Sequence, residues 1–140
     1  MPEFLPAAPQ HARRFGKTRA AQSTAVVEDY VELIDDLSAH APLVRPTDIA
    51  RHLGVSHATA IKTIVRLKRE ALATSLPYRG VALTETGIAL AARCRERHRV
   101  VVAVLTKIGV PVEAAEDDAE GIEHHISLPT LAAFRAFLAA

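Results

Sequence analysis

The chain has 140 residues, 49% of them hydrophobic, which suits one ordinary domain or two small ones that share a core. Its formal net charge of +1 hides a basic middle, which suits a polyanion, and an acidic late segment, which suits a cation. The single cysteine excludes internal disulfides, and signal-peptide and membrane-spanning runs are absent, so we expect a cytoplasmic protein without membrane contact.

The first segment, residues 1–24, has no sustained apolar period and contains three prolines. Its four basic side chains are Arg13, Arg14, Lys17 and Arg19. This composition predicts a flexible basic tail. Such a tail either adds contacts with phosphate groups or remains a solvated arm, and the sequence leaves both interpretations open.

A helix is predicted from Ala25 to about His40, where Pro42 ends the pattern. Its apolar residues recur at spacings of three and four and therefore form one stripe. They are Val27, Tyr30, Val31, Ile34 and Leu37.

Two shorter helices joined by a tight turn follow. Pro46 lies early in the first, Gly54 makes the turn, and Ser56 caps the second, which runs from about His57 to Arg69. In the second helix we expect five apolar side chains to face inward: Ala60, Ile61, Ile64, Val65 and Leu67. This order is typical of a helix-turn-helix.

Residues 72–76 and 80–84 then predict two strands joined by a turn, which is the wing of a winged helix-turn-helix. Three more helices are expected, at residues 84–104, 113–125 and 127–138. The predicted fold class is therefore mainly α, with a winged helix-turn-helix domain at residues 25–87 and an all-helical domain at residues 88–140.

The outward side of the second helix of the pair, together with the tip of the wing, carries hydroxyl, imidazole and basic groups. The candidate DNA-binding residues are Ser56, His57, Thr59, Lys62, Thr63, Arg66 and Arg79. These groups suit base edges in a major groove and phosphate oxygens beside it, which makes double-stranded DNA the expected partner. A solvated basic helix with an exposed turn is the alternative interpretation.

One such helix covers only a few base pairs, so we expect a homodimer that reads two half-sites. The apolar C-terminal helices are the candidate dimer surface. Their side chains also suit a core within one subunit, so the dimer remains a hypothesis.

The acidic segment contains Glu120, Glu123 and His124, which a helix places on one face. No basic residue lies between Glu113 and Glu123, and a divalent cation would relieve the repulsion among the carboxylates. Further candidate ligands are Asp29, Glu32 and His98. The pair of carboxylates at Asp29 and Glu32 also suits a solvated helix face, and a lone histidine is often structural.

The six candidates comprise four carboxylates and two imidazoles without sulfur. Such an oxygen-rich set favours manganese or ferrous iron over zinc or copper. Bridging carboxylates would allow two ions per subunit.

Four segments are similar to one known family: Glu28-Asp29-Tyr30-Val31-Glu32-Leu33-Ile34, Ile49-Ala50-Arg51-His52-Leu53-Gly54-Val55-Ser56, Tyr78-Arg79-Gly80-Val81-Ala82-Leu83-Thr84 and Asp118-Ala119-Glu120-Gly121-Ile122-Glu123-His124-His125. With Arg97-His98, they make the chain resemble the manganese transport regulators of the diphtheria-toxin-repressor family. The resemblance covers roughly residues 25–138.

The resemblance implies a homodimeric winged-helix repressor that binds operators when loaded with metal, with manganese-importer genes as its usual targets. It implies that the residues at 88–140 form a metal-binding and dimerisation domain. By position, the implied ligands of a two-Mn²⁺ site are Asp29, Glu32, His98, Glu120, Glu123 and His124, with Gly121 adding a backbone carbonyl. Iron-responsive relatives have Met and Cys where this chain has Asp29 and Glu123, which favours manganese.

Two alternatives remain at this point. One is an iron- or zinc-responsive repressor of the same architecture. The other is an enzyme or metal store built on a carboxylate-bridged metal pair in a helical bundle. Because no nucleophile with an adjacent base and no phosphate-binding glycine loop is present, we expect no catalysis and no small organic substrate.

Overall fold

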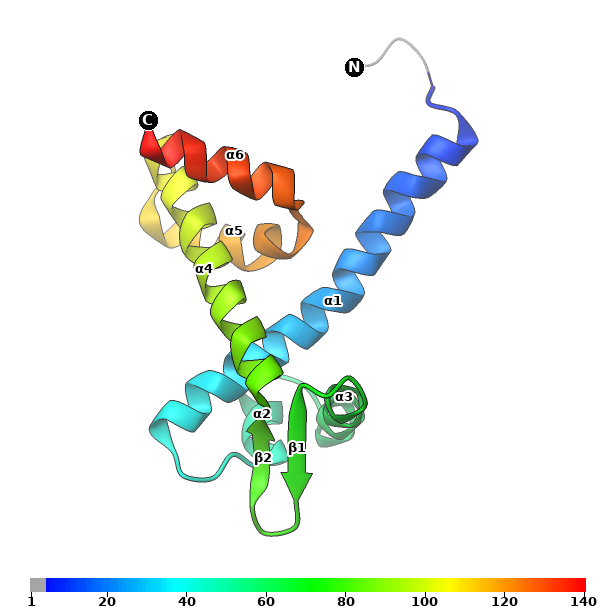
Figure 1. The fold of residues 1–140 in the computed structure, drawn as a ribbon, viewed down its shortest axis with the longest axis vertical. Helices are drawn as coiled ribbons and strands as arrows, with labels where there is room; N and C mark the ends of the chain where they lie inside the picture. Colours follow the sequence, from blue (N-terminus) through cyan, green and yellow to red (C-terminus); the bar gives the residue numbers. More distant parts are fainter. Residues whose placement is uncertain (1–4) are drawn as a thin grey trace.

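The computed structural model describes residues 5–140, which form six α-helices, one short 3-10 helix and a two-stranded sheet (Figure 1). The elements are α1 (Ala8–His40), α2 (Pro46–Leu53), α3 (His57–Arg69), β1 (Ala73–Leu76), β2 (Gly80–Leu83), α4 (Glu85–Lys107), α5 (Val112–Ile122), η1 (Glu123–His125) and α6 (Leu128–Ala139). This order confirms the predicted class, a winged helix-turn-helix followed by an all-helical half.

The predicted flexible tail is wrong for residues 8–24. There the chain is already helical, and α1 continues without a break to His40. Pro9 lies in the first turn, where its missing N–H costs no hydrogen bond, and the alanines and basic residues that follow favour helix. The apolar stripe is missing because this part of α1 projects away from the body (Figure 1). Residues 1–4 of the predicted tail lie outside the described residues.

The second part of α1 forms the centre of the winged helix-turn-helix half. Four of the five residues of its predicted stripe are buried, with Val31 and Ile34 wholly inaccessible to solvent, and Leu37 is half-buried. These side chains pack with Ile49 of α2 and Leu67 of α3 in one apolar cluster, which the inner side of the wing completes.

The turn between α2 and α3 has the predicted geometry. Gly54 adopts a left-handed conformation with φ of 69°, and the Oγ of Ser56 accepts a hydrogen bond from the N–H of Thr59 at 3.1 Å. The prediction for the inner face of α3 was wrong at two positions, since Ile61 and Val65 are 40% and 52% exposed. Each follows a buried residue of the helix and is therefore turned about 100° away from the core.

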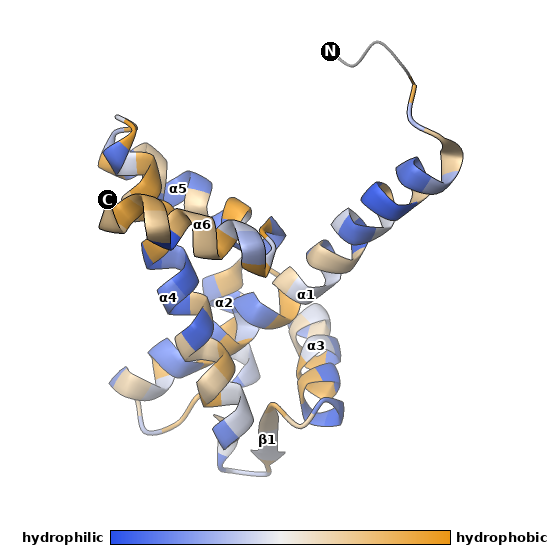
Figure 2. Cartoon of the chain, turned by 45° about the horizontal axis from the view of Figure 1, so that its top comes forward, coloured by the Kyte–Doolittle hydropathy of each residue, from blue (hydrophilic) through white to orange (hydrophobic). Residues whose placement is uncertain are grey.

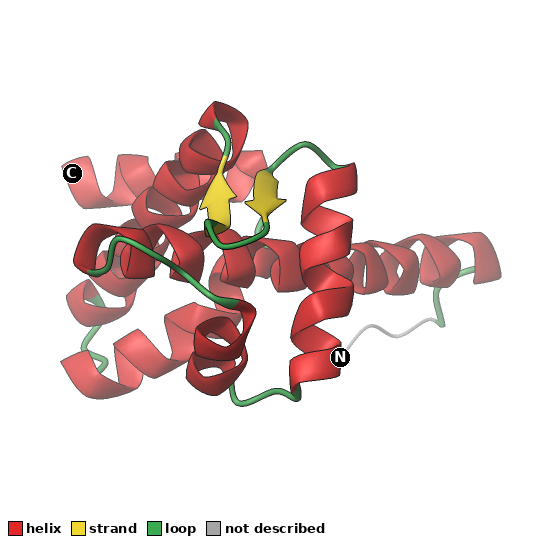
Figure 3. Ribbon diagram, turned by 90° about the horizontal axis from the view of Figure 1, so that it is seen from below, coloured by secondary structure: helices red, strands yellow, loops and turns green. Residues whose placement is uncertain are grey.

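The wing is attached to the segment before α2. Its strands pair antiparallel, from Ala73 opposite Leu83 to Leu76 opposite Gly80. The N–H of Val81 donates to the carbonyl oxygen of Val44 at 2.8 Å. Seen from below, the strands lie beside α3 at the end of the molecule opposite α5 and α6 (Figure 3).

The long helix α4 connects the two halves. It begins beside the wing, packs against α1, and carries α5 and α6 at its far end (Figures 1 and 2). Gly87 allows its first turn to approach the wing, because a Cβ atom there would lie 2.1 Å from the carbonyl oxygen of Leu72. Among the described residues 5–140, no helix is both long and apolar enough to cross a membrane.

We expect Gly87→Ala to lower the free energy of unfolding by about 1–3 kcal/mol, because the added methyl group pushes α4 away from the backbone of the wing. Gly121→Ala is the matched control, since a Cβ there meets nothing within 4 Å. It should be neutral or stabilise the helix by up to about 1 kcal/mol. Urea unfolding of the metal-free protein measures both, and equal effects would contradict the close packing at Gly87.

Candidate metal centre

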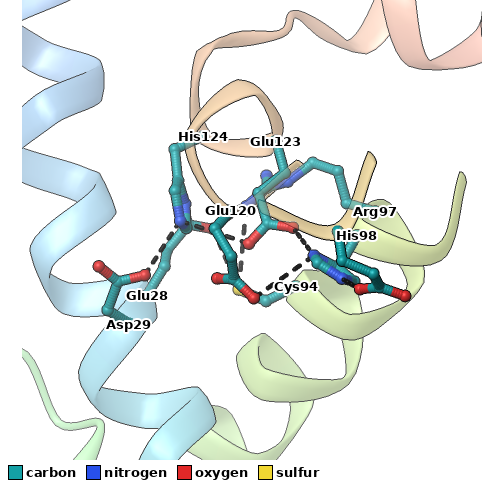
Figure 4. A network of polar contacts seen from close by, with 9 residues as sticks. Glu28, Asp29, Cys94, Arg97, His98, Glu120, Glu123 and His124 are labelled. Atoms are coloured by element: carbon teal, nitrogen blue, oxygen red, sulfur yellow. Dashed lines mark hydrogen bonds and ion pairs between the residues drawn. The ribbon is translucent and has the colours of Figure 1, made fainter. Parts of the chain in front are cut away.

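Polar side chains from four elements meet between the two halves of the chain (Figure 4). Helix α1 contributes Glu28 and Asp29, α4 contributes Cys94, Arg97 and His98, α5 contributes Glu116 and Glu120, and η1 contributes Glu123 and His124. The predicted helix over residues 113–125 ends at Ile122, and its last three residues tighten into η1. This change turns Glu123 and His124 into the interior while Glu120 remains exposed at the edge.

Glu123 lies at the centre of this group, with a side chain wholly buried. Its Oε2 atom is 2.7 Å from Nδ1 of His98, and its Oε1 atom is 3.4 Å from Nε2 of His124. The single carboxylate thus faces two imidazoles, one from α4 and one from η1.

Two groups of ligand atoms share this carboxylate. In the first, Nε2 of His124 lies 3.0 Å from Oδ1 of Asp29 and close to Oε1 of Glu123. In the second, one ligand atom each of His98, Glu120 and Glu123 lies within 4.8 Å of the others. Five of the six predicted ligands are therefore in one continuous set of contacts.

Two atoms of the first group point to a missing partner. Oε1 of Glu123 and Nε2 of His124 are buried, and neither forms a hydrogen bond of acceptable geometry with any described residue. Buried polar atoms are rarely left in this way, because each has lost its bonds to water. A metal ion bound by both atoms would satisfy them, and their chemistry fits such an ion.

Glu32 and Gly121 stand apart from these contacts. Glu32 lines a surface hollow together with Asp29 and Glu120, and burial, then the nearby carboxylates of Glu120 and Asp36, raise its pKa. Gly121 is exposed near the end of α5. The roles of both residues in metal binding stay predictions.

Glu28 is the main residue of the site that sequence reasoning missed. It is buried, and its carboxylate contacts Nδ1 of His124 at 3.3 Å, Sγ of Cys94 at 3.2 Å and the guanidinium of Arg97. Burial alone would raise its pKa, but these contacts outweigh burial and hold the pKa at about 2. Its place beside the buried Val27 was the available signal, because it lies on the edge of the apolar stripe of α1.

Glu116 was missed as well. Its Oε2 atom lies 2.7 Å from Nε2 of His98, on the side of the ring away from Glu123. The spacing of Glu116, Glu120 and Glu123 along the helix was the available signal. Each imidazole thus has one nitrogen against an outer carboxylate, Glu28 or Glu116, and its other nitrogen directed to the shared group, an arrangement that orients metal-binding histidines.

The excess of carboxylates determines the protonation of the site. Burial raises the pKa of Glu123 to about 7. Burial opposes protonation of His124, but Asp29 and Glu28 outweigh it and raise that pKa to about 10. Burial likewise opposes protonation of His98, and Glu116 and Glu123 outweigh it, so this pKa is raised too. The space around Glu123, His98 and His124 therefore favours positive charge, either as bound protons or as a cation.

The candidate DNA-binding residues belong to α3, its N-cap and the turn of the wing, and Figure 1 shows α3 and the wing away from α5. His57, Thr59, Lys62 and Arg79 are exposed, Thr63 is half-buried, and Ser56 caps α3. Arg66 is engaged within the chain: it donates to the carbonyl oxygen and Oγ of Ser23 on α1, each at 3.1 Å, and pairs with Glu70. It therefore connects α3 to α1, and its contact with phosphate stays a prediction.

Comparison with known proteins agrees with this division into halves. Residues 22–81 match the N-terminal DNA-binding domain of iron-dependent repressors, and residues 84–140 match their metal-binding and dimerisation domain. The chain is 44% identical over 128 residues to the transcriptional regulator MntR of Escherichia coli O157:H7, covering 91% of this chain and 83% of the relative. The chain belongs to the MntR family of transcriptional regulators. It is accordingly a regulator and not an enzyme, as predicted.

Two further matches support this membership. MntR of Salmonella typhimurium is also 44% identical, over 91% of this chain and 82% of that protein. A solved manganese-dependent transcriptional repressor in complex with manganese superposes with a TM-score of 0.72 at 28% identity, over 81% of this chain and 52% of that one. The chain thus spans about half the length of that structure.

We expect Glu28→Gln to lower the free energy of unfolding of the metal-free protein by about 3 kcal/mol, because it leaves Arg97 and His124 without their shared buried anion. Glu96→Gln is the control: it removes the same charge from an exposed pair with Arg99 and should leave stability nearly unchanged. Urea unfolding in the presence of a chelator compares them. Equal stability of the two variants would show that Glu28 does not hold the buried cations together.

Proposed function

We propose that this MntR-family chain is a manganese-responsive repressor that binds operator DNA as a metal-loaded homodimer and controls manganese-uptake genes. The observation that carries the proposal is the buried carboxylate of Glu123 between two imidazoles, with polar atoms left unsatisfied beside it. The MntR relatives and the manganese-bound structural neighbour support the choice of metal. We place the protein in the cytoplasm, where a bacterial operator lies.

The donor set supports manganese in its own right. The proposed ligands are the carboxylates of Asp29, Glu32, Glu120 and Glu123 and the imidazoles of His98 and His124, with the carbonyl of Gly121 as an addition. Hard oxygen donors with some nitrogen suit Mn²⁺. The one nearby thiol, Cys94, faces Glu28, and burial followed by that carboxylate raises its pKa, so it remains a protonated neighbour.

The two groups of ligand atoms support our proposal of two ions per subunit. We assign one ion to Asp29, Glu123 and His124, and the other to His98, Glu120 and Glu123, with Glu32 available to either. A metal ion held by these residues would supply positive charge in place of the protons now favoured on His124 and Glu123. Loading should therefore release protons, as is usual when ligands are protonated in the free protein.

The proposed ligands come from both halves of the chain, and this distribution suggests how metal binding regulates DNA binding. Asp29 and Glu32 belong to α1, the helix that holds the core of the DNA-binding half (residues 25–87), whereas His98, Glu120, Glu123 and His124 belong to the metal-binding half (residues 88–140). Metal therefore connects the halves across α1, and Arg66 connects α1 to α3. We infer that metal narrows the range of positions open to the two recognition helices of a dimer, which is a shift in population.

The matched domain supports the homodimer, because residues 84–140 match the metal-binding and dimerisation domain of iron-dependent repressors. Two copies would present two α3 helices to an operator with two half-sites.

We expect Mn²⁺ to tighten operator binding of the native protein by about 5–150-fold, the usual range of coupling between sites, and to have no effect on Glu123→Gln. Glu113→Gln is the control, because it removes an exposed charge from the start of α5. Fluorescence anisotropy on promoter DNA from a manganese-importer gene, at buffered free Mn²⁺, measures both. Unchanged manganese dependence in Glu123→Gln would contradict the proposal, and parallel titrations with Fe²⁺ and Zn²⁺ test the metal preference.

Lys62→Ala should weaken DNA binding alike for all sequences and reduce the slope of log affinity against log salt by about 0.9 per subunit, because one phosphate contact is lost. Arg99→Ala provides the control, since Arg99 is an exposed cation on α4. Salt titrations of the metal-loaded protein give both slopes. A slope equal to that of the control would remove Lys62 from the DNA interface.

A further inference from the structure

The projecting first part of α1, residues 8–22, is here called the basic arm (Figures 1 and 2). Its exposed cations are Arg13, Arg14, Lys17 and Arg19. Within residues 5–27 there is no carboxylate, and the first one that follows is Glu28. Among the described residues, no acidic group pairs with these four cations. The arm is thus uniformly basic and leaves its charges unused within the subunit.

The root of the arm is held against the recognition helix. Arg66 of α3 donates two hydrogen bonds to Ser23, the residue that follows the arm. Slightly further along α1, Val26 lines one hollow together with Thr59 and Thr63 of α3. Because α1 is a single helix, the direction of the arm is set by this contact, and DNA bound to α3 would lie at the base of the arm.

The composition of the arm indicates what kind of partner it fits. A helix that packs on a protein needs an apolar stripe, and the arm exposes Phe15 alone among large apolar residues. The cations Arg13 and Lys17 are spaced i, i+4, so they repel each other and weaken the helix unless an anion lies near. The acidic helix α5 of a second copy is the rival partner, but there Glu116 is already engaged with His98. A polyanion needs no apolar contact, so it fits the arm better than a protein surface does.

We propose that the basic arm binds the phosphate backbone of DNA outside the segment read by α3. This inference rests on the proposed function, since α3 must first place the duplex. The arm has 15 residues and is about 22 Å long, which corresponds to roughly six further base pairs at about 3.4 Å each. Contacts of this kind add affinity without adding sequence preference.

The test uses the full-length, manganese-loaded protein and two duplexes. One duplex carries the operator with ten flanking base pairs at each end, and the other is trimmed to the operator (lengths chosen from the roughly six base pairs above). The arm variant is the double substitution Arg13→Gln with Lys17→Gln, in which glutamine keeps a high helix propensity. Its matched control is Arg93→Gln with Arg99→Gln, which removes two exposed cations from α4.

On the long duplex we expect the arm variant to bind about tenfold more weakly than the control, and its salt slope to fall by about 1.8 per subunit for two lost phosphate contacts. On the trimmed duplex the two variants should bind alike. Helix content by circular dichroism and Mn²⁺ affinity without DNA should match the native protein, so that a loss reports on the arm.

Equal affinity of the arm variant and the control on the long duplex would overturn the proposal. Equal weakening on both duplexes with a lower dimer fraction in sedimentation would also overturn it, and would assign the arm to a second copy of the chain. Failure of the proposed function has a different signature, because then the native protein itself shows no manganese-dependent binding to either duplex.

Discussion

A carboxylate held out of water between two imidazoles determines how the two halves of this chain are joined. Burial favours the neutral form of Glu123, and four further acidic groups lie against the same two imidazoles, so the region needs positive charge to be stable. The histidines, one from α4 and one from η1, supply it when they are protonated. A divalent cation held by these residues would supply more positive charge at a single position, and it would also restrain the elements that carry its ligands.

Helix α1 connects the charged site with the helix-turn-helix. The same rigid element carries the basic arm, the contact with Arg66 on α3, the acidic group beside His124 and the apolar stripe of the core. A change in the position of Asp29 is therefore passed along α1 to the contact with α3, although α3 itself contributes no ligand. Interfaces packed this densely tend to occupy discrete arrangements, which suits a regulator that alternates between states.

The sequence predicted the parts of the fold that have local signals. Gly54, Ser56 and the short strands mark the turn, the cap and the wing, and each depends on neighbours within a few residues. The helicity of residues 8–24 was not predicted because an apolar period arises only where a helix packs on a partner, and, within the described part of the chain, residues 8–22 have no contact with another element. Asp29 and Glu123 were recognised by type and spacing. Glu28 and Glu116 were missed because their roles depend on how α1, α4 and α5 cross, which spacing within one helix does not contain.

The unbroken course of α1 has a further mechanical consequence, because the helix is a lever with its fulcrum beside the metal centre. From Asp29 to Ala8 there are 21 residue steps, or about 32 Å of helix. A tilt of about 5° at the fulcrum would move the tip by roughly 3 Å, about the rise of one base pair. A displacement too small to disturb the core near Ile34 is therefore large enough at the tip to change which phosphate groups the chain can touch.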